Sequence, residues 1–167
     1  MLHVISNPSA EYNQSRNGRI RGIYKYWDSK RQGRRMPSRS DMDPVEIPEF
    51  LSNVILVDVF YEPLWFRYRL VGTDRVKKRG FDPTGGRIWE KLPWNDSHSV
   101  TEYFREIAGK RCVQFADYPF AEPRGWYVYS DRIMMPQSND NDIANMVFIY
   151  ALWKDAPGRV SDPEDAP

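Results

Sequence analysis

Apolar residues near the start of the chain recur with helical spacing. From Gly18 onward they occupy positions i, i+3, i+4 and i+7, which share one face of a helix. These residues are Ile20, Ile23, Tyr24 and Trp27. Gly33 and Pro37 then end the pattern. The sequence predicts an N-terminal amphipathic helix within residues 18–35, whose apolar stripe is buried on its own domain or on a second subunit.

Later segments have the character of strands. Val54–Phe60 is apolar on both faces apart from Asp58, as in the interior of a sheet, whereas residues 66–72 alternate. Three more strands are expected at 112–118, 126–135 and 145–153, the last apolar on both faces. Between the second and third strands lie short helical patterns and one longer helix, residues 99–107, which starts with a capping box.

This order predicts an α+β domain with one five-stranded antiparallel sheet, because two hairpin strands and a three-strand meander can join. Helices are expected on one face of the sheet, together with the N-terminal amphipathic helix. We expect residues 36–154 to form the domain. Residues 1–17 are polar and 155–167 are acidic and proline-rich, so both are expected to be flexible tails.

Composition and charge narrow the class of protein. The 167 residues are 41% hydrophobic, which is enough for a packed core, and the net charge is +1. The charge is uneven, since residues 1–40 carry nine basic residues against two acidic ones. The longest apolar runs are far shorter than a membrane span, no signal peptide is recognised, and the single Cys112 excludes an intrachain disulfide. A cytoplasmic protein is expected.

Three motifs resemble the PAS domain, most closely a bacterial family of small stand-alone PAS-like proteins. They are Met36–Pro48 leading into the first strand, Phe66–Thr73, and Gly80–Gly85. The resemblance covers about residues 20–154. It implies the strand order 2-1-5-4-3 and a pocket between the sheet and its helices. It also implies sensing of a small molecule, haem or flavin, or protein contacts alone, with signalling through a dimer.

Bulky residues of the predicted strands and helices are expected to surround this pocket or, alternatively, to fill the core. They are Tyr68, Leu70, Ile88, Phe104, Ile107, Phe115, Tyr127, Tyr129, Met134, Phe148 and Tyr150. A homodimer interface is expected at the stripe of the N-terminal helix, namely Ile20, Ile23, Tyr24 and Trp27. Packing of this stripe on its own sheet is the alternative.

Cofactor chemistry has little support in the sequence. The histidines are His3, in the tail, and His98, whose polar neighbours indicate a helix cap rather than a haem ligand. Cys112 lacks the motif of flavin-adduct photosensors, and Asp140 and Asp142 lack the calcium-loop pattern and suit a hairpin turn. Neither haem, flavin nor metal is expected, a small organic ligand is possible, and the identity of any ligand is left open.

The sequence therefore predicts a non-catalytic sensory or signalling module that works as a homodimer. It binds a small ligand, docks onto an unidentified signalling protein, or does both. Two alternatives stay open. An isomerase or hydrolase would use a buried carboxylate, Asp58 or Asp131. A nucleic-acid-associated protein would use the basic segment Arg16–Arg39, in which Tyr24, Tyr26 and Trp27 are interleaved.

Overall fold

The computed structural model describes residues 17–88, 94–116, 120–121 and 127–154. The tails expected at 1–17 and 155–167 lie outside these residues apart from Asn17, and so does most of the short helical pattern near Trp89. No described helix combines the length and the apolar character needed to cross a membrane.

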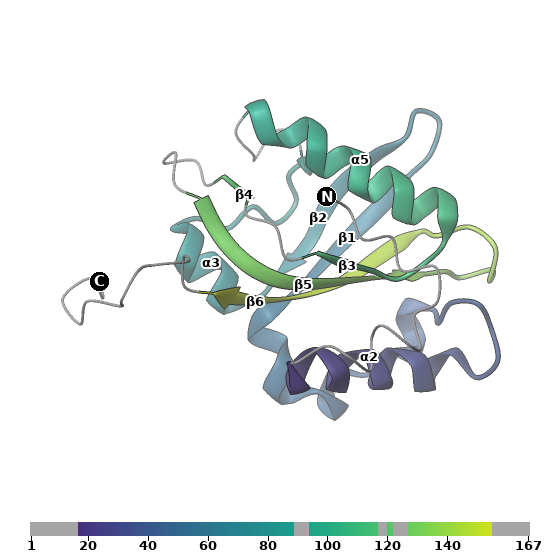
Figure 1. The fold of residues 1–167 in the computed structure, drawn as a ribbon. Coiled ribbons are helices and arrows are strands. Elements are labelled where there is room, and N and C mark those ends of the chain that lie inside the picture. Colours follow the sequence, from purple (N-terminus) through teal and green to yellow (C-terminus); the bar gives the residue numbers. More distant parts are fainter. Residues whose placement is uncertain (1–16, 89–93, 117–119, 122–126, 155–167) are drawn as a thin grey trace.

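One antiparallel sheet organises the molecule (Figure 1). Its strands are β1 (Val54–Phe60), β2 (Trp65–Val71), β3 (Gln114–Ala116), β5 (Tyr127–Gln137) and β6 (Met146–Lys154). Their order is β2-β1-β6-β5-β3, and the short β4 (Phe120–Ala121) pairs with the start of β5. The prediction of an α+β fold with strand order 2-1-5-4-3 is confirmed.

The two strands predicted to be doubly buried lie at the centre of the sheet. β1 pairs with β6 in a register that places Val57 opposite Val147 and Ile55 opposite Ile149. Six of the seven β1 residues are buried. An apolar run suits this position because residues of both strands are buried in the clusters on the two faces of the sheet.

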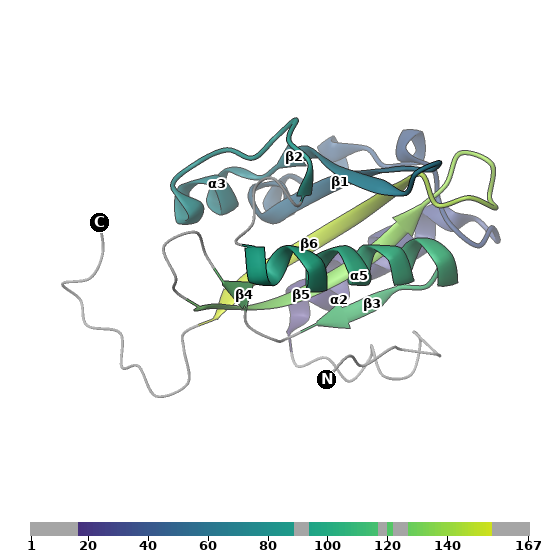
Figure 2. The same ribbon diagram turned by 90° about the horizontal axis from the view of Figure 1, so that it is seen from above.

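Helices lie on opposite faces of the sheet (Figures 1 and 2). Helix α2 (Gly18–Arg31) covers one face, while α5 (Trp94–Lys110) and the short α3 (Thr73–Arg79) cover the other. Asn17 caps α2 by accepting a hydrogen bond from the backbone N–H of Arg19, and Gln32 ends it in the left-handed conformation.

The apolar stripe of α2 is buried in the core of its own domain. Ile20 and Ile23 are fully buried and Trp27 is 3% exposed. The indole N–H of Trp27 donates to the carbonyl oxygen of Pro136 at 3.2 Å, which ties α2 to β5. These side chains offer no surface to a second copy, so the dimer interface expected at Ile20, Ile23, Tyr24 and Trp27 is replaced by its alternative, packing on the chain's own sheet.

Three 3-10 turns connect α2 to β1: η1 (Arg39–Asp41), η2 (Pro44–Glu46) and η3 (Pro48–Asn53). The segment after Asp43 forms two short turns rather than one α-helix. Pro48 has no N–H to donate to the carbonyl of Pro44, so the α-helical hydrogen bond cannot form there. The N–H of Ile47 makes the shorter-range bond to Pro44 instead. Asp43 caps η2 by accepting from the N–H of Val45, as the Asp-Pro pair predicts.

Candidate functional site

The face of the sheet beneath α5 brings together part of the predicted pocket. Tyr68, Ile88, Phe104, Ile107 and Met134 are all buried in one apolar cluster on this face. Phe104 of α5 lies over β2, with its ring centroid 5.3 Å from that of Phe66. We call this cluster, together with Ile55, Val57 and Ile149 of the sheet, the α5-side core.

The other predicted pocket residues are not part of this group. Phe148 and Tyr150 are buried on the opposite face, in the cluster beneath α2, and the half-buried Phe115 packs there too. Leu70 is 43% exposed. Tyr127 and Tyr129 belong to β5, but their side chains lie outside the described part of the structure. The expected list mixed two faces because β6 is apolar on both, and its sequence cannot show which residues face α5.

Two polar side chains of the α5 face have no hydrogen-bonding partner. Gln114 is opposite Met134 in the β3–β5 register, and Ser130 follows Met134 by four residues, so all three face α5. Gln114 and Ser130 are both 0% exposed. Among the described residues, neither the Gln114 amide nor the Ser130 hydroxyl meets a partner. Leaving such a group unsatisfied costs about 1–3 kcal/mol.

Charged and aromatic groups lie beside these two residues. Arg132 is buried between Ser130 and Met134 on the same face of β5. Trp153 is opposite Ser130 on β6, and the guanidinium carbon of Arg75 lies 3.9 Å from the centroid of its ring. Arg75 is only 1% exposed. Cation–π stacking of this kind reduces the cost of burying a guanidinium group.

We call Gln114, Ser130, Arg132, Arg75 and Trp153 the polar end of the α5-side core. Sequence reasoning missed it. The segment Thr73–Arg79 is basic in sequence, and its mid-helix Val76 places Arg75 beside the buried face. Polar residues at alternate positions of β5, Ser130 and Arg132, were the available signal for a polar patch inside a buried strand.

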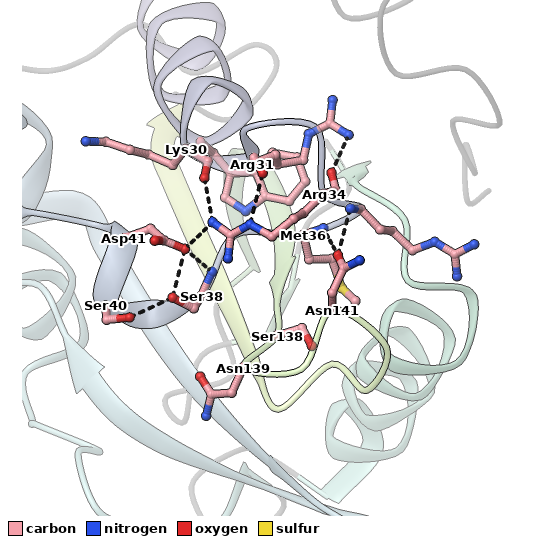
Figure 3. Close-up of polar contacts among 12 residues, drawn as sticks. Lys30, Arg31, Arg34, Met36, Ser38, Ser40, Asp41, Ser138, Asn139 and Asn141 are labelled. Carbon is pink, nitrogen blue, oxygen red and sulfur yellow. Dashed lines mark hydrogen bonds and ion pairs between the residues drawn. The ribbon is translucent and has the colours of Figure 1, made fainter.

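A second polar cluster joins the end of α2 to the β5–β6 turn (Figure 3). Asp41 accepts hydrogen bonds from the backbone N–H and hydroxyl of Ser38, at 2.7 and 2.8 Å, and from Arg34 at 2.6 Å. These contacts, the Ser38 backbone bond foremost, lower the pKa of the Asp41 carboxyl. The side-chain oxygen of Asn141 accepts from the backbone N–H of Arg35 at 2.8 Å. The polar groups hydrogen-bond to one another, so the segment Met36–Pro48, one of the motifs that resemble the PAS domain, is held against the β5–β6 turn.

Asp140 lies in the β5–β6 turn, and its contribution to the stability of the fold depends on pH. Backbone N–H groups of Ile143 and Asp142, with the Ser138 hydroxyl, lower the pKa of the Asp140 carboxyl from 3.8 to about 2. Because the pKa is lowered on folding, Asp140 stabilises the fold above pH 3.8, and this contribution is lost as the pH falls through about 2.

Urea unfolding of wild type and Asp140→Asn should therefore differ near about pH 5 and converge near about pH 2. A carboxyl titration midpoint near 3.8 in a carbon-detected NMR experiment would contradict this.

The alternative chemistries find little geometric support in the described residues. No group of three or more His, Cys, Asp or Glu side chains that could hold a metal occurs among them. Asp58 forms an ion pair with Arg67 at 2.7 Å on the face away from α5, and Asp131 lies on that face too. Burial raises the pKa of the Cys112 thiol, which keeps it protonated. His98 lies in α5, where its side chain is outside the described part.

The basic N-terminal segment is partly neutralised by its own neighbours. Lys30 pairs with Glu46 at 2.5 Å, Arg34 with Asp41, and Arg31 with Asp28. Trp27, one of the aromatic residues expected to stack on bases, is buried in the core. The arrangement therefore offers less free charge and less aromatic surface than the sequence alone suggests.

Comparison with known proteins agrees with this fold. A family model described as the PAS domain matches residues 16–147. The chain belongs to the PAS domain family. The LOV protein of Rhodobacter sphaeroides is 9% identical, with 70% of this chain and 71% of that one covered and a TM-score of 0.50. The PAS domain of a Colwellia psychrerythraea protein is also 9% identical, covering 70% of this chain and all of that one, with a TM-score of 0.48.

At these identities the likeness concerns the PAS fold alone. No protein of curated function matches the sequence. A PAS domain has a sensory or signalling character in general.

Proposed function

We propose that this PAS domain is a non-catalytic sensory module that binds a small polar organic molecule at the polar end of the α5-side core and relays its presence to a partner protein. The observation that carries the proposal is the pair Gln114 and Ser130, two fully buried polar side chains that meet no hydrogen-bonding partner among the described residues. A ligand that hydrogen-bonds to either side chain would remove the desolvation cost of that group.

The surrounding residues suit such a ligand. The Gln114 amide provides one donor group and one acceptor, and the Ser130 hydroxyl can act as either, so both kinds of polar group can be bound. Phe104 and Ile107 of α5 supply apolar walls. A molecule held between the sheet and α5 stabilises one position of this helix over others, which changes the surface offered to a partner.

Native mass spectrometry of the freshly purified protein tests the proposal. Wild type should carry an extra bound mass, and Gln114→Leu should lose it. Gln137→Leu is a matched control, because Gln137 is equally buried and equally unpartnered but lies on the α2 face. This variant should keep the bound mass.

Thermal unfolding gives the second readout. With no ligand bound, both Gln→Leu variants should be more stable than wild type by about 1–3 kcal/mol, since each removes an unsatisfied buried amide. Adduct-free wild type, together with unchanged stability in Gln114→Leu, would contradict the proposal.

A further inference from the structure

One part of the sheet is left open by the helices. Side chains of β1 and β2 that point to the α2 face form pairs, Asp58 with Arg67 and Phe60 with Trp65. Among the described residues, none from β2 belongs to the cluster buried beneath α2. α2 runs along β5, at the other end of this face (Figure 1). We call Phe60, Trp65, Arg67, Arg69 and Leu70, together with the buried Asp58 that pairs with the arginines, the β1–β2 surface.

Aromatic and cationic groups alternate on this surface. The rings of Phe60 and Trp65 stack with centroids 4.1 Å apart and planes 9° apart. Arg67 lies over the Phe60 ring at 5.0 Å, and Arg87 lies over the Trp65 ring at 4.4 Å. These stacked rings and guanidinium groups are therefore held in one geometry before a partner binds, which lowers the conformational entropy lost on binding.

The surface carries more positive than negative charge. Asp58 accepts from Arg67 at 2.7 Å, while Arg69 is 3.8 Å from the same carboxylate, too far for a hydrogen bond. Arg69 sits at the bulge of β2 and its side chain is 54% exposed. The single carboxylate of Asp58 therefore faces two guanidinium groups, and the Arg69 guanidinium is accessible to solvent. Leu70 adds exposed apolar area next to it.

We propose that the β1–β2 surface docks an acidic segment of a partner protein that carries an apolar side chain beside its carboxylates. Arginine and aromatic residues are the types enriched at the energetic centres of protein interfaces. Two other partners fit less well. A second copy of the chain would bring like-charged arginines together, and a nucleic acid would place its phosphates next to the Asp58 carboxylate and the apolar Leu70. The inference specifies the docking step of the proposed function and does not require that a small molecule binds.

The partner segment is expected to lie across the face of β2 rather than extend the sheet. The free edge of β2 is already used in part, because Tyr68 exchanges backbone hydrogen bonds with Gly86 and Gly85 at 3.0 and 2.7 Å. The bulge at Arg69 further interrupts a regular ladder. Side-chain contacts, and the carboxylates above all, then determine affinity.

The test uses the full chain with 5-fluorotryptophan and follows the fluorine resonance of Trp65, assigned with Trp65→Phe. The probe is a synthetic peptide made of repeats of Glu-Asp-Leu-Ser-Gly, with a Gln-Asn-Leu-Ser-Gly peptide as its neutral match. We expect the acidic peptide alone to shift the Trp65 resonance, and Arg69→Glu to weaken binding about tenfold or more. Lys25→Glu, an exposed charge reversal on α2, should leave binding within about twofold.

Three results would overturn the inference. The first is that the Trp65 resonance does not shift at peptide concentrations on the order of 1 mM. The second is that Lys25→Glu weakens peptide binding as much as Arg69→Glu does, and the third is that a single-stranded oligonucleotide binds at Trp65 more tightly than the peptide. The proposed function fails separately: Gln114→Leu should lose the bound small molecule and keep peptide binding, whereas Arg69→Glu should do the reverse.

Discussion

Replacing Trp27 by alanine is expected to lower the free energy of unfolding by about 3–5 kcal/mol, the range for truncating a large buried aromatic residue. Trp27 is 3% exposed, packs among residues of the sheet, and donates its indole N–H to Pro136. The substitution removes the packing contacts and leaves that carbonyl without its donor. Urea unfolding followed by circular dichroism measures the loss.

Lys25→Ala is the control on the same helix, because Lys25 is exposed and should change stability by no more than about 0.5 kcal/mol. The midpoint for wild type should not depend on protein concentration, since the stripe is buried within one chain. A midpoint that rises with concentration, together with a small effect of Trp27→Ala on the dilute protein, would show that the stripe is buried by a second copy instead.

Gly72→Ala should be nearly as damaging, for a purely steric reason. A Cβ at Gly72 would lie 2.3 Å from the carbonyl oxygen of Ser52 and 2.6 Å from that of Leu51. The backbone of Gly72, at φ −62° and ψ 152°, is open to any residue, so torsional strain is not the cause. Because backbone rather than a flexible side chain opposes the methyl group, the end of β2 and η3 must separate, at a cost of about 3 kcal/mol.

Gly109→Ala provides the matched comparison. Gly109 lies in α5, and a Cβ there meets nothing within 4 Å. Alanine in place of glycine inside a helix should stabilise the fold by up to about 1 kcal/mol. Thermal unfolding of the two variants should shift in opposite directions, and a neutral Gly72→Ala would mean that β2 and η3 are not held in close contact.

Much of the fold was predictable because periodicity reports local structure. The apolar run Val54–Phe60 has the bounds expected from sequence. The strand order followed from the resemblance and agrees with the doubly apolar character of β1 and β6. The face on which each side chain lies was harder to predict. A strand buried on both sides has no alternation of polar and apolar residues to show the direction of its side chains. Phe148 and Tyr150 were therefore grouped with residues of the other face.

The polar end of the α5-side core was not predictable for a different reason. Arginine is rarely buried, and the local sequence does not mark Arg75 or Arg132 as the exceptions that they are. Burial of Arg75 depends on the ring of Trp153, which is far away in sequence and contacts it only once α3 and β6 have come together. Gln114 gave no signal because its place opposite Met134 depends on the β3–β5 register.

The place of β6 between β1 and β5 has a consequence for synthesis. β6 is the last described strand, yet it pairs with both halves of the sheet. Until residues 146–154 leave the ribosome, the β1–β2 hairpin and the β3–β5 pair have no strand to join them, and the apolar residues of β1 stay uncovered. Cooperative folding must therefore follow completion of the domain rather than accompany its translation. A chain arrested before β6 would be a substrate for chaperones.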